Sequence, residues 1–297
     1  MNTQVDILLS TYNNSSYLEY LLQSLNRQTY QNFKLLLRDD GSNDKIKQFI
    51  KSAISEFDNF ELTDSKQNIG YFLSFCELIN SSKSDLIFLC DHDDIWHDEK
   101  IEKFVDAYEQ YPNKNIPILI CSDLSLIDDN GHHIPSSYFK AMNFIPTKSD
   151  DTLFIRNSVP GCSMAFNQQL KQLFQNKKKI IPYHDHILIL LALLYGKIIY
   201  LDENLISYRI HSSNTMAKIA FTKRDKINNI IDIYRFNFSY KKFIESRYSS
   251  FLEQIKMILD QDMPKVYDIL INDLTSNKNK YFAPRDISER IELFFLW

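Results

Sequence analysis

Strand-like and helix-like segments alternate along the first 125 residues of this chain, and no other feature restricts its fold as strongly. Each short apolar run is followed by a polar turn and then by a segment whose apolar residues recur at helical spacing. Repeated β-α-β order predicts an α/β fold with a mostly parallel sheet, flanking helices and right-handed crossovers. The predicted strands are residues 5–10, 33–37, 60–63, 86–90, 118–122, 164–166, 198–201 and 205–210.

The predicted strand 86–90 runs directly into acid. Its apolar residues are followed by Asp91, His92, Asp93 and Asp94. Ligands of open α/β sheets bind at the carboxyl ends of the strands. Three carboxylates in four residues repel one another unless a positive charge lies among them, and a divalent cation that faces a phosphate-bearing substrate meets this need. The alternative is a solvated acidic loop. The buried-strand pattern before the acids favours the cation site over the solvated loop. We assign no role to Asp94.

Polar clusters also end two other predicted strands. Thr11, Tyr12 and Asn13 follow the first strand, and the sequence Asp-Asp-Gly-Ser at residues 39–42 follows the second. Parallel strands place such ends along one edge, where a base, a ribose and a diphosphate can bind in a row. Tyr12 can cover the face of a base, and Asp40 can accept the imide N–H of uracil or thymine. Taken singly, Tyr12 could be a packing residue and residues 39–42 a turn; the three clusters together favour a nucleotide site.

Composition excludes several classes of protein. The net charge of −4 gives no reason to expect nucleic acid, and neither Gly-x-Gly-x-x-Gly nor Gly-x-x-x-x-Gly-Lys occurs, which argues against dinucleotide-binding folds and P-loop NTPases. The longest apolar run, residues 187–195, is less than half of the about 20 residues that a membrane span needs, and no N-terminal signal is visible. Four cysteines without paired metal spacing suggest buried thiols in a reducing compartment: Cys76, Cys90, Cys121 and Cys162. We therefore expect a cytoplasmic protein.

The motifs together resemble the family-2 glycosyltransferases of GT-A fold, over about residues 4–212. The resemblance implies a Rossmann-like, mostly parallel sheet flanked by helices, which binds a nucleotide-diphosphate sugar. The Asp-x-Asp-Asp-x-Trp form of the acidic motif looks most like bacterial rhamnosyltransferases of surface polysaccharide synthesis. The segments that carry the resemblance are Ser10–Asn13, Gln28–Tyr30, Asp39–Ser42, Asn68–Gly70 and Asp91–Trp96.

The resemblance also implies roles for single residues. Asp91 would lie near the ribose and sugar of the donor, and Asp93 would bind the metal. His211 matches a late histidine that often completes the metal site, although a surface histidine is the alternative. Aspartate oxygens suit Mg²⁺, and an added imidazole suits Mn²⁺ equally. The residues expected to contact the rest of the donor nucleotide are Thr11, Tyr12, Asp40 and Asn68.

The catalytic base implied by the resemblance is Asp185. The family usually carries an acidic pair before a helix at this place, whereas here the preceding residue is His184. Inversion by single displacement needs a carboxylate that takes the proton of the attacking hydroxyl, and it needs no covalent enzyme nucleophile. The alternative role of Asp185 is a helix N-cap, and the two roles are compatible.

The expected function is therefore inverting, metal-dependent transfer of a sugar from dTDP-L-rhamnose or a UDP-hexose. The acceptor would be a hydroxyl of a glycan, lipid-linked or glycoprotein substrate. A sugar-nucleotide pyrophosphorylase is an alternative, but it would need a glycine- and lysine-rich loop after the first strand, and residues 10–14 are not one. A catalytically silent scaffold subunit is another, and loss of Asp91 or Asp93 would favour it; both are present.

The composition changes near residue 216, where strand signals end and helical patterns begin. We expect a glycosyltransferase domain at residues 1–215 and a helical C-terminal region at 216–297. Residues 218–247 hold eight basic and three acidic residues with interleaved aromatics. This segment suits peripheral contact with anionic lipid at the inner face of the plasma membrane, a homodimer surface or a solvated helix face. The apolar, uncapped ending at 291–297 leads us to expect that the natural chain continues.

Overall fold

The computed structural model describes residues 2–13, 16–55, 59–142, 144–146, 153, 157–177 and 183–211. The chain divides into two compact units, Met1–Arg209 and Ile210–Trp297. Only Ile210 and His211 of the second unit are among the described residues. The predicted domain boundary at residue 215 and the predicted helices beyond it lie outside the described residues and stay predictions.

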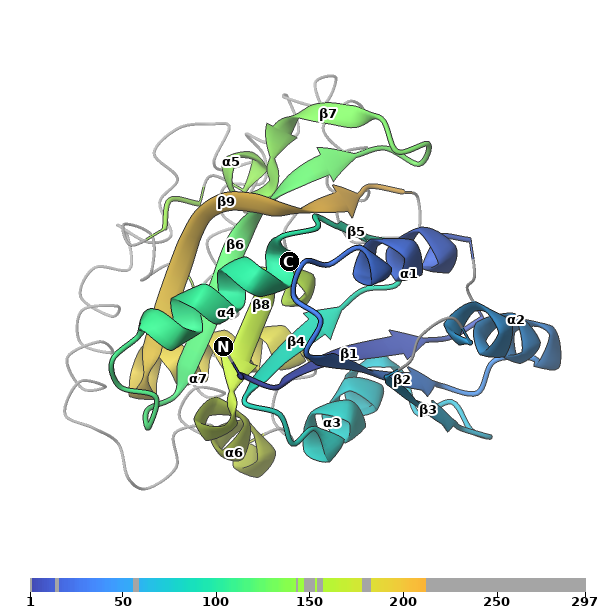
Figure 1. Cartoon of the computed structure of the whole chain (residues 1–297), viewed down its shortest axis with the longest axis horizontal. Helices are drawn as coiled ribbons and strands as arrows, with labels where there is room; N and C mark the ends of the chain where they lie inside the picture. The colour runs from blue at the N-terminus through green and yellow to red at the C-terminus, as the bar shows by residue number, and fades with distance from the viewer. Residues whose placement is uncertain are drawn as a thin grey trace, which may run out of the picture. The chain divides into compact units, whose positions relative to one another are not determined.

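A single mixed sheet forms the centre of the first unit (Figure 1). Its strands follow the order β3-β2-β1-β4-β8-β6-β9-β5, and β7 pairs with β6 outside this path. The first four strands are parallel to one another, β6 is parallel to β9, and β8 runs antiparallel to both β4 and β6. The strands are β1 (Val5–Thr11), β2 (Phe33–Asp39), β3 (Phe60–Asp64), β4 (Leu86–Cys90), β5 (Ile95–Trp96), β6 (Ile118–Ile127), β7 (His133–Ser137), β8 (Met164–Asn167) and β9 (Lys197–Arg209).

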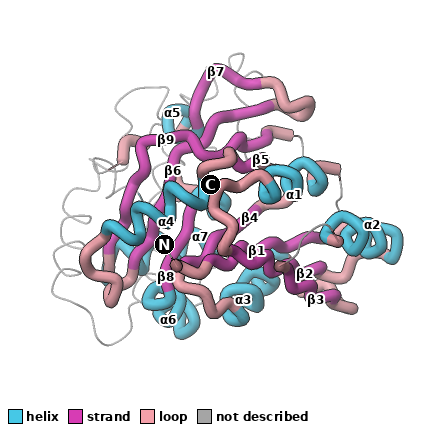
Figure 2. The backbone as a smooth tube through the Cα atoms, in the orientation of Figure 1, coloured by secondary structure: helices cyan, strands magenta, loops and turns pink. Residues whose placement is uncertain are grey.

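Helices cover both faces of the sheet (Figures 1 and 2). α1, α2 and α4 lie on one face, and α3, α6 and α7 pack together on the other. This division follows from right-handed crossovers, because the chain moves from β1 outward to β3 and then returns to β4 on the other side of β1. The helices are α1 (Leu18–Asn26), α2 (Asp44–Ile54), α3 (Tyr71–Ser81), α4 (Lys100–Gln110), α5 (Tyr138–Ala141), α6 (Gln168–Lys177) and α7 (His184–Tyr195), and a 3₁₀ turn, η2 (Gly161–Ser163), precedes β8.

The predicted α/β order is confirmed, with three differences in the strands. Residues 197–209 form one continuous strand, β9, where the sequence predicts two. β5 and β7 were not predicted, because two residues are too few for a periodic signal and β7 contains Pro135. Among the described residues, the helices all fall short of the length and hydropathy needed to span a membrane.

Candidate active site

The carboxyl ends of β1, β2 and β4 form one edge of the sheet, as the polar clusters predict. Thr11 at the end of β1 pairs in register with Asp39 at the end of β2. On the other side of β1, Leu9 pairs with Cys90, the residue before the acidic motif. The Thr11 hydroxyl also lies 3.4 Å from Asp39 Oδ1. The three clusters are therefore neighbours in space.

Hydrogen bonds fasten the loop after β1 to the loop after β2. Asn13, with a φ of 47°, donates its main-chain N–H to Ser42 Oγ at 2.8 Å. Its side-chain oxygen accepts from the main-chain and side-chain nitrogens of Asn43 at 2.9 and 3.0 Å. Tyr12, the residue before Asn13, is 51% exposed. Tyr12 is therefore not a core-packing residue, and its contact with a base stays a prediction.

Asp40 joins the second cluster to the Asn68–Gly70 motif. Its carboxylate is 2% exposed and accepts the main-chain N–H groups of Ile69 and Gly70 at 3.0 and 2.8 Å. Close approach of the two loops requires Gly41, which has a φ of +84° and where a Cβ atom would lie 2.9 Å from the Asn68 nitrogen. Asp40 thus orders the loop that carries Asn68. Contact of either residue with a nucleotide stays a prediction.

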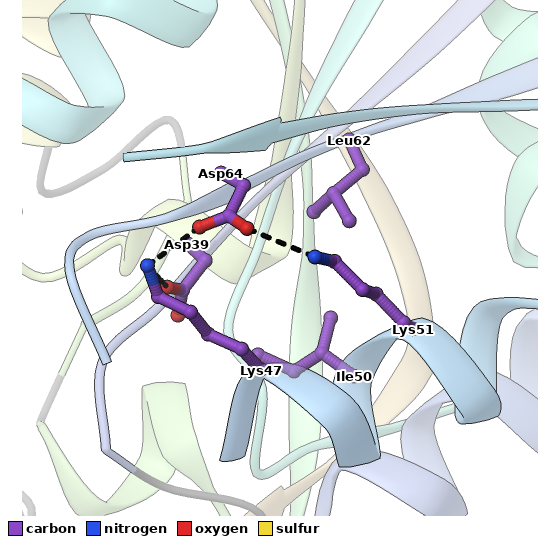
Figure 3. Close-up of a pocket in the computed structure, with 6 residues that line it drawn as sticks. All are labelled: Asp39, Lys47, Ile50, Lys51, Leu62 and Asp64. Carbon is purple, nitrogen blue, oxygen red and sulfur yellow. Dashed lines mark hydrogen bonds and ion pairs between the residues drawn. The ribbon is translucent and has the colours of Figure 1, made fainter. Parts of the chain in front are cut away.

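Two lysines of α2 neutralise the acids at the ends of β2 and β3 (Figure 3). Lys47 Nζ lies 2.6 Å from Asp64 Oδ1 and 4.0 Å from Asp39 Oδ2, and Lys51 Nζ lies 3.1 Å from Asp64 Oδ2. The hydrogen bonds from Lys47 and Lys51 hold the pKa of the Asp64 carboxyl below its usual range. Because the charged side chains that line the pocket in Figure 3 pair with one another, we assign this pocket a structural role beside the site.

The acids after β4 repel one another, as their spacing predicts. Burial, followed by the charges of Asp93 and Asp185, raises the pKa of Asp91 to about 7. Burial and the charges of Asp93 and Asp91 raise the pKa of the fully buried Asp94 well above its usual range. Asp185 belongs to a different element, and its influence on Asp91 brings the predicted base and the acidic motif into one site.

The described residues contain a group whose donor atoms suit a divalent cation. One side-chain ligand atom from each of Asp91, Asp94 and Cys162 lies within 4.8 Å of the other two. Asp94 Oδ1 accepts the main-chain N–H of Arg209 at 3.2 Å, while the buried Oδ2 has no hydrogen-bond partner among the described residues. An unsatisfied buried carboxylate oxygen beside a second carboxylate fits Mg²⁺ or Mn²⁺. Cys162 had no sequence signal for this role, because it stands alone and lies far from the acids along the chain.

A fully buried lysine lies beneath the acidic motif. Lys100, 0% exposed, donates to the carbonyl oxygen of Cys162 at 2.8 Å, and its Nζ lies 3.2 Å from the centroid of the Trp96 ring. Burial lowers the pKa of Lys100 to about 7, although the acids Asp94 and Asp91 raise it. The Lys100 ammonium group therefore lies over the ring of the tryptophan that follows the acids, and periodicity alone did not distinguish Lys100 from a surface lysine of α4.

The Gln28–Tyr30 motif holds the segment that follows the acids. Gln28 Nε2 donates to the His97 carbonyl at 2.8 Å, and Gln28 Oε1 accepts the Ile101 N–H at 3.1 Å. The Thr29 N–H donates to the Asp98 carbonyl at 2.8 Å. Gln28 and Thr29 of this motif therefore bond main-chain groups in the segment that leads from the acidic motif into α4.

Asp185 lies in the first turn of α7 and is held on both oxygens. Its Oδ2 accepts from Asn157 Nδ2 at 2.8 Å, and its Oδ1 accepts the His186 N–H at 2.8 Å. The N-cap alternative is wrong in position, because Tyr183 occupies the cap. The role of Asp185 as base stays a prediction.

At the position before Asp185, where the family usually carries an acidic residue, this chain has His184, whose ring is neutral and buried. It is 1% exposed, stacks on Phe75 with the ring centroids 4.4 Å apart, and has neither ring nitrogen hydrogen-bonded within the described residues. Burial lowers the pKa of His184 to about 4. His211 follows β9 and is also buried, so the surface alternative is wrong; its role as a metal ligand stays a prediction.

Comparison with known proteins places these motifs among sugar transferases. The sequence model described as Glycosyl transferase family 2 matches residues 6–174. An uncharacterized glycosyltransferase of Rickettsia typhi is 27% identical over 71% of this chain and 65% of its own length. One of Nostoc sp. is 23% identical over 73% of this chain and 68% of its own. For an uncharacterized glycosyltransferase of Rickettsia conorii, the match spans only 36% of its length.

Solved structures share the fold. Staphylococcus aureus TarS 1–349 in complex with UDP-GlcNAc has a TM-score of 0.57 and 16% identity, covering 99% of this chain and 79% of its own. The mannosyltransferase PcManGT of Pyrobaculum calidifontis, in complex with GDP-Man and Mn²⁺, has a TM-score of 0.58 and 11% identity, covering 100% of this chain and 85% of its own. The predicted GT-A-like α/β fold is confirmed.

Proposed function

Because the chain belongs to glycosyl transferase family 2, we propose that it moves a sugar from a nucleotide-diphosphate donor to an acceptor hydroxyl with inversion at the anomeric carbon. The observation that best supports this reaction is that Asp91 and Asp185 act within one site. Asp91 follows the end of β4, Asp185 lies in the first turn of α7, and the charge of Asp185 contributes to raising the pKa of Asp91. A donor-binding acid and a base in one site are what single displacement requires.

The donor would lie along the carboxyl ends of β1, β2 and β4. Thr11, Tyr12, Asp40 and Asn68 would contact the nucleotide, and Asp91 the ribose and sugar. The related solved structures hold UDP-GlcNAc or GDP-Man, which supports a nucleotide-diphosphate sugar as the ligand class. We propose dTDP-L-rhamnose or a UDP-hexose as the donor, with the rhamnosyl donor resting on the form of the acidic motif.

A divalent cation, Mn²⁺ or Mg²⁺, would be held by the acidic motif. Asp93 and His211 are the ligands implied by the family resemblance, and Asp91, Asp94 and Cys162 are the residues whose donor atoms lie together. When bound, the ion neutralises the charge that develops on the departing nucleoside diphosphate. Aspartate oxygens suit Mg²⁺, and the added imidazole of His211 would suit Mn²⁺ equally.

Asp185 would accept the proton of the attacking hydroxyl. A carboxylate has about four lone-pair sites, and the bonds from Asn157 and the His186 N–H occupy two of them. The two bonds fix the carboxylate and leave acceptor capacity for a hydroxyl at about 3 Å. The acceptor would be a glycan, a lipid-linked substrate or a glycoprotein.

The basic aromatic segment 218–247 would bring a cytoplasmic enzyme to a lipid-linked acceptor or form a dimer surface. The segment lies outside the described residues, so this part rests on its charge. We expect the protein to sediment with anionic liposomes at low salt and to be released at high salt. Indifference to anionic liposomes at low salt would reject the membrane role.

A donor-hydrolysis screen tests the proposed function. Wild type would be incubated with UDP-, GDP- and dTDP-sugars together with Mn²⁺, Mg²⁺ or EDTA, and release of the nucleoside diphosphate measured. We expect hydrolysis of at least one donor with metal, none with EDTA, and none in Asp91→Asn. Asp98→Asn is the matched control, because Asp98 follows the same motif but is exposed and pairs with Arg27. Wild type that hydrolyses no donor, or Asp91→Asn that hydrolyses as wild type does, refutes the proposal; the first result favours the silent scaffold.

A further inference from the structure

Arg209, the last residue of β9, reaches two loops at the edge of the site. It is 3% exposed, and its Nε donates to the carbonyl oxygen of Asp93 at 3.0 Å. Its Nη1 donates to the carbonyl oxygens of Asp128 and Asp129, both at 3.1 Å. Its main-chain N–H donates to Asp94 Oδ1 at 3.2 Å. One residue therefore holds both the acidic motif and the turn between β6 and β7.

The same guanidinium also contacts the residue that caps α1. Its central carbon lies 4.4 Å from the ring centroid of Tyr17, the residue before the helix, and the Tyr17 hydroxyl lies 3.3 Å from Asp129 Oδ1. A planar guanidinium can stack on a ring and donate to separate oxygens at once, whereas an ammonium group acts as a point charge. The contacts join three segments that are far apart in the sequence and require an arginine.

We propose that Arg209 is a positioning residue for the metal and donor site, a role that rests on the proposed function. Arg209 holds Asp93 through the main-chain oxygen of that residue. It holds one oxygen of Asp94, and the other is the buried oxygen that lacks a hydrogen-bond partner among the described residues. The backbone of the acidic motif is thus fixed before a cation arrives, and the second oxygen of Asp94 is left for the cation.

Binding of Mn²⁺ to the full chain tests this role without measuring activity. The free-Mn²⁺ EPR signal would be titrated for wild type and Arg209→Lys, with and without UDP, GDP or dTDP. Loss of residues that orient metal ligands typically weakens metal binding about 10- to 100-fold, and we expect a weakening in this range. The matched control is Arg27→Lys, because Arg27 is exposed and pairs with Asp98 on the surface. It should bind Mn²⁺ as wild type does.

A purely structural role for Arg209 predicts a different outcome. We expect Arg209→Lys to keep the wild-type circular dichroism spectrum, to need about 10-fold more Mn²⁺ for half-maximal donor hydrolysis, and to recover turnover at saturating Mn²⁺. Folded Arg209→Lys with wild-type Mn²⁺ affinity overturns the inference. A variant that recovers no turnover at any Mn²⁺ concentration also overturns it.

Tyr17→Leu gives a second test that leaves the arginine in place. It removes the ring that covers the guanidinium and the hydroxyl that lies 3.3 Å from Asp129 Oδ1, and we expect Mn²⁺ binding to weaken about threefold. If Arg209→Lys does not fold, this variant decides, and wild-type affinity in Tyr17→Leu overturns the inference. Wild type that binds no Mn²⁺ under any condition rejects the proposed metal dependence together with the inference, whereas equal binding by wild type and variants rejects the inference alone.

Discussion

Gly41→Ala should destabilise the protein by breaking the contact between the two loops of the nucleotide edge. Gly41 has a φ of +84°, and a Cβ atom there would meet main-chain atoms of Asn68 at 2.9 Å and Gln67 at 3.0 Å. Gly70 provides the matched control, because it has a φ of +86° and a Cβ atom there would meet nothing within 4 Å. Both substitutions place an alanine at a positive φ, and only Gly41→Ala adds a steric clash.

The structure gives the expected magnitudes. A positive φ costs alanine about 1–2 kcal/mol in the left-handed helical region and about 1–3 kcal/mol at the φ of 86° and ψ of 156° of Gly70, and the smaller entropy of the unfolded chain returns about 0.4–1 kcal/mol. Gly70→Ala should therefore lower the free energy of unfolding by about 1–2 kcal/mol. The clash at Gly41 is with backbone, which cannot rotate away, and forced repacking costs about 1–3 kcal/mol more. We expect Gly41→Ala to lose about 2–4 kcal/mol.

Urea unfolding of both variants measures this difference. Trp96 is buried in the first unit, so the change of its fluorescence on exposure reports on the sheet and α4. The clash also displaces the loop that Asp40 holds, so Gly41→Ala should lose more affinity for UDP or GDP than Gly70→Ala does. Equal loss of stability in the two variants would refute the close approach of the loops.

Three further changes test the acidic site. Asp93→Asn should abolish metal-dependent donor hydrolysis while urea unfolding stays as in wild type; retained hydrolysis would remove Asp93 from the metal ligands. Asp185→Asn should leave nucleotide affinity unchanged and slow transfer to the acceptor about 10²- to 10⁴-fold in steady-state assays, and an unaltered transfer rate would place the base elsewhere. Because burial lowers the pKa of Lys100 from 10.5 to about 7, the unfolded chain binds more protons between these pH values, and stability rises with pH. In metal-free buffer, wild type should therefore gain up to about 1.4 kcal/mol per pH unit relative to Lys100→Met between pH 7 and 9.5, and a constant difference in the free energy of unfolding would contradict the buried charge.

The sequence predicts those parts of the fold in which one element carries its own signal. The strand 86–90 is apolar at every position and buried, and the acids after it end up at the expected edge. The strand β9 was predicted as two pieces because polar residues at 202–204 interrupt its apolar pattern. Its register with β6 shifts at the same place, so pairing with β6 continues the strand where its own side chains do not indicate one.

The candidate site was predictable where a motif is local in sequence. Asp91 and Asp93 were proposed because they follow a predicted strand, and Asp185 was proposed through the family resemblance at the start of a predicted helix; their roles stay predictions. Lys100 and Arg209 could not, because a buried cation is recognised only from the carbonyl groups and rings that surround it in the fold. Cys162 likewise reaches the acids only through η2 and β8, which the sheet inserts beside β4.

The far edge of the sheet has a mechanical consequence for the acids. β5 follows β4 after only four residues, yet β8, β6 and β9 separate the two strands in the sheet. Four steps between flat neighbouring strands would take about 19 Å, whereas a fully extended link of five Cα–Cα steps spans at most about 18 Å. Residues 92 and 93 form a turn, which shortens the link further, so this half of the sheet must be curled. Asp91–Asp94 thus connect the two ends of this curled half of the sheet. A change that widens the curl, even one at the pairing of Trp96 with Ile206, would therefore displace the acids.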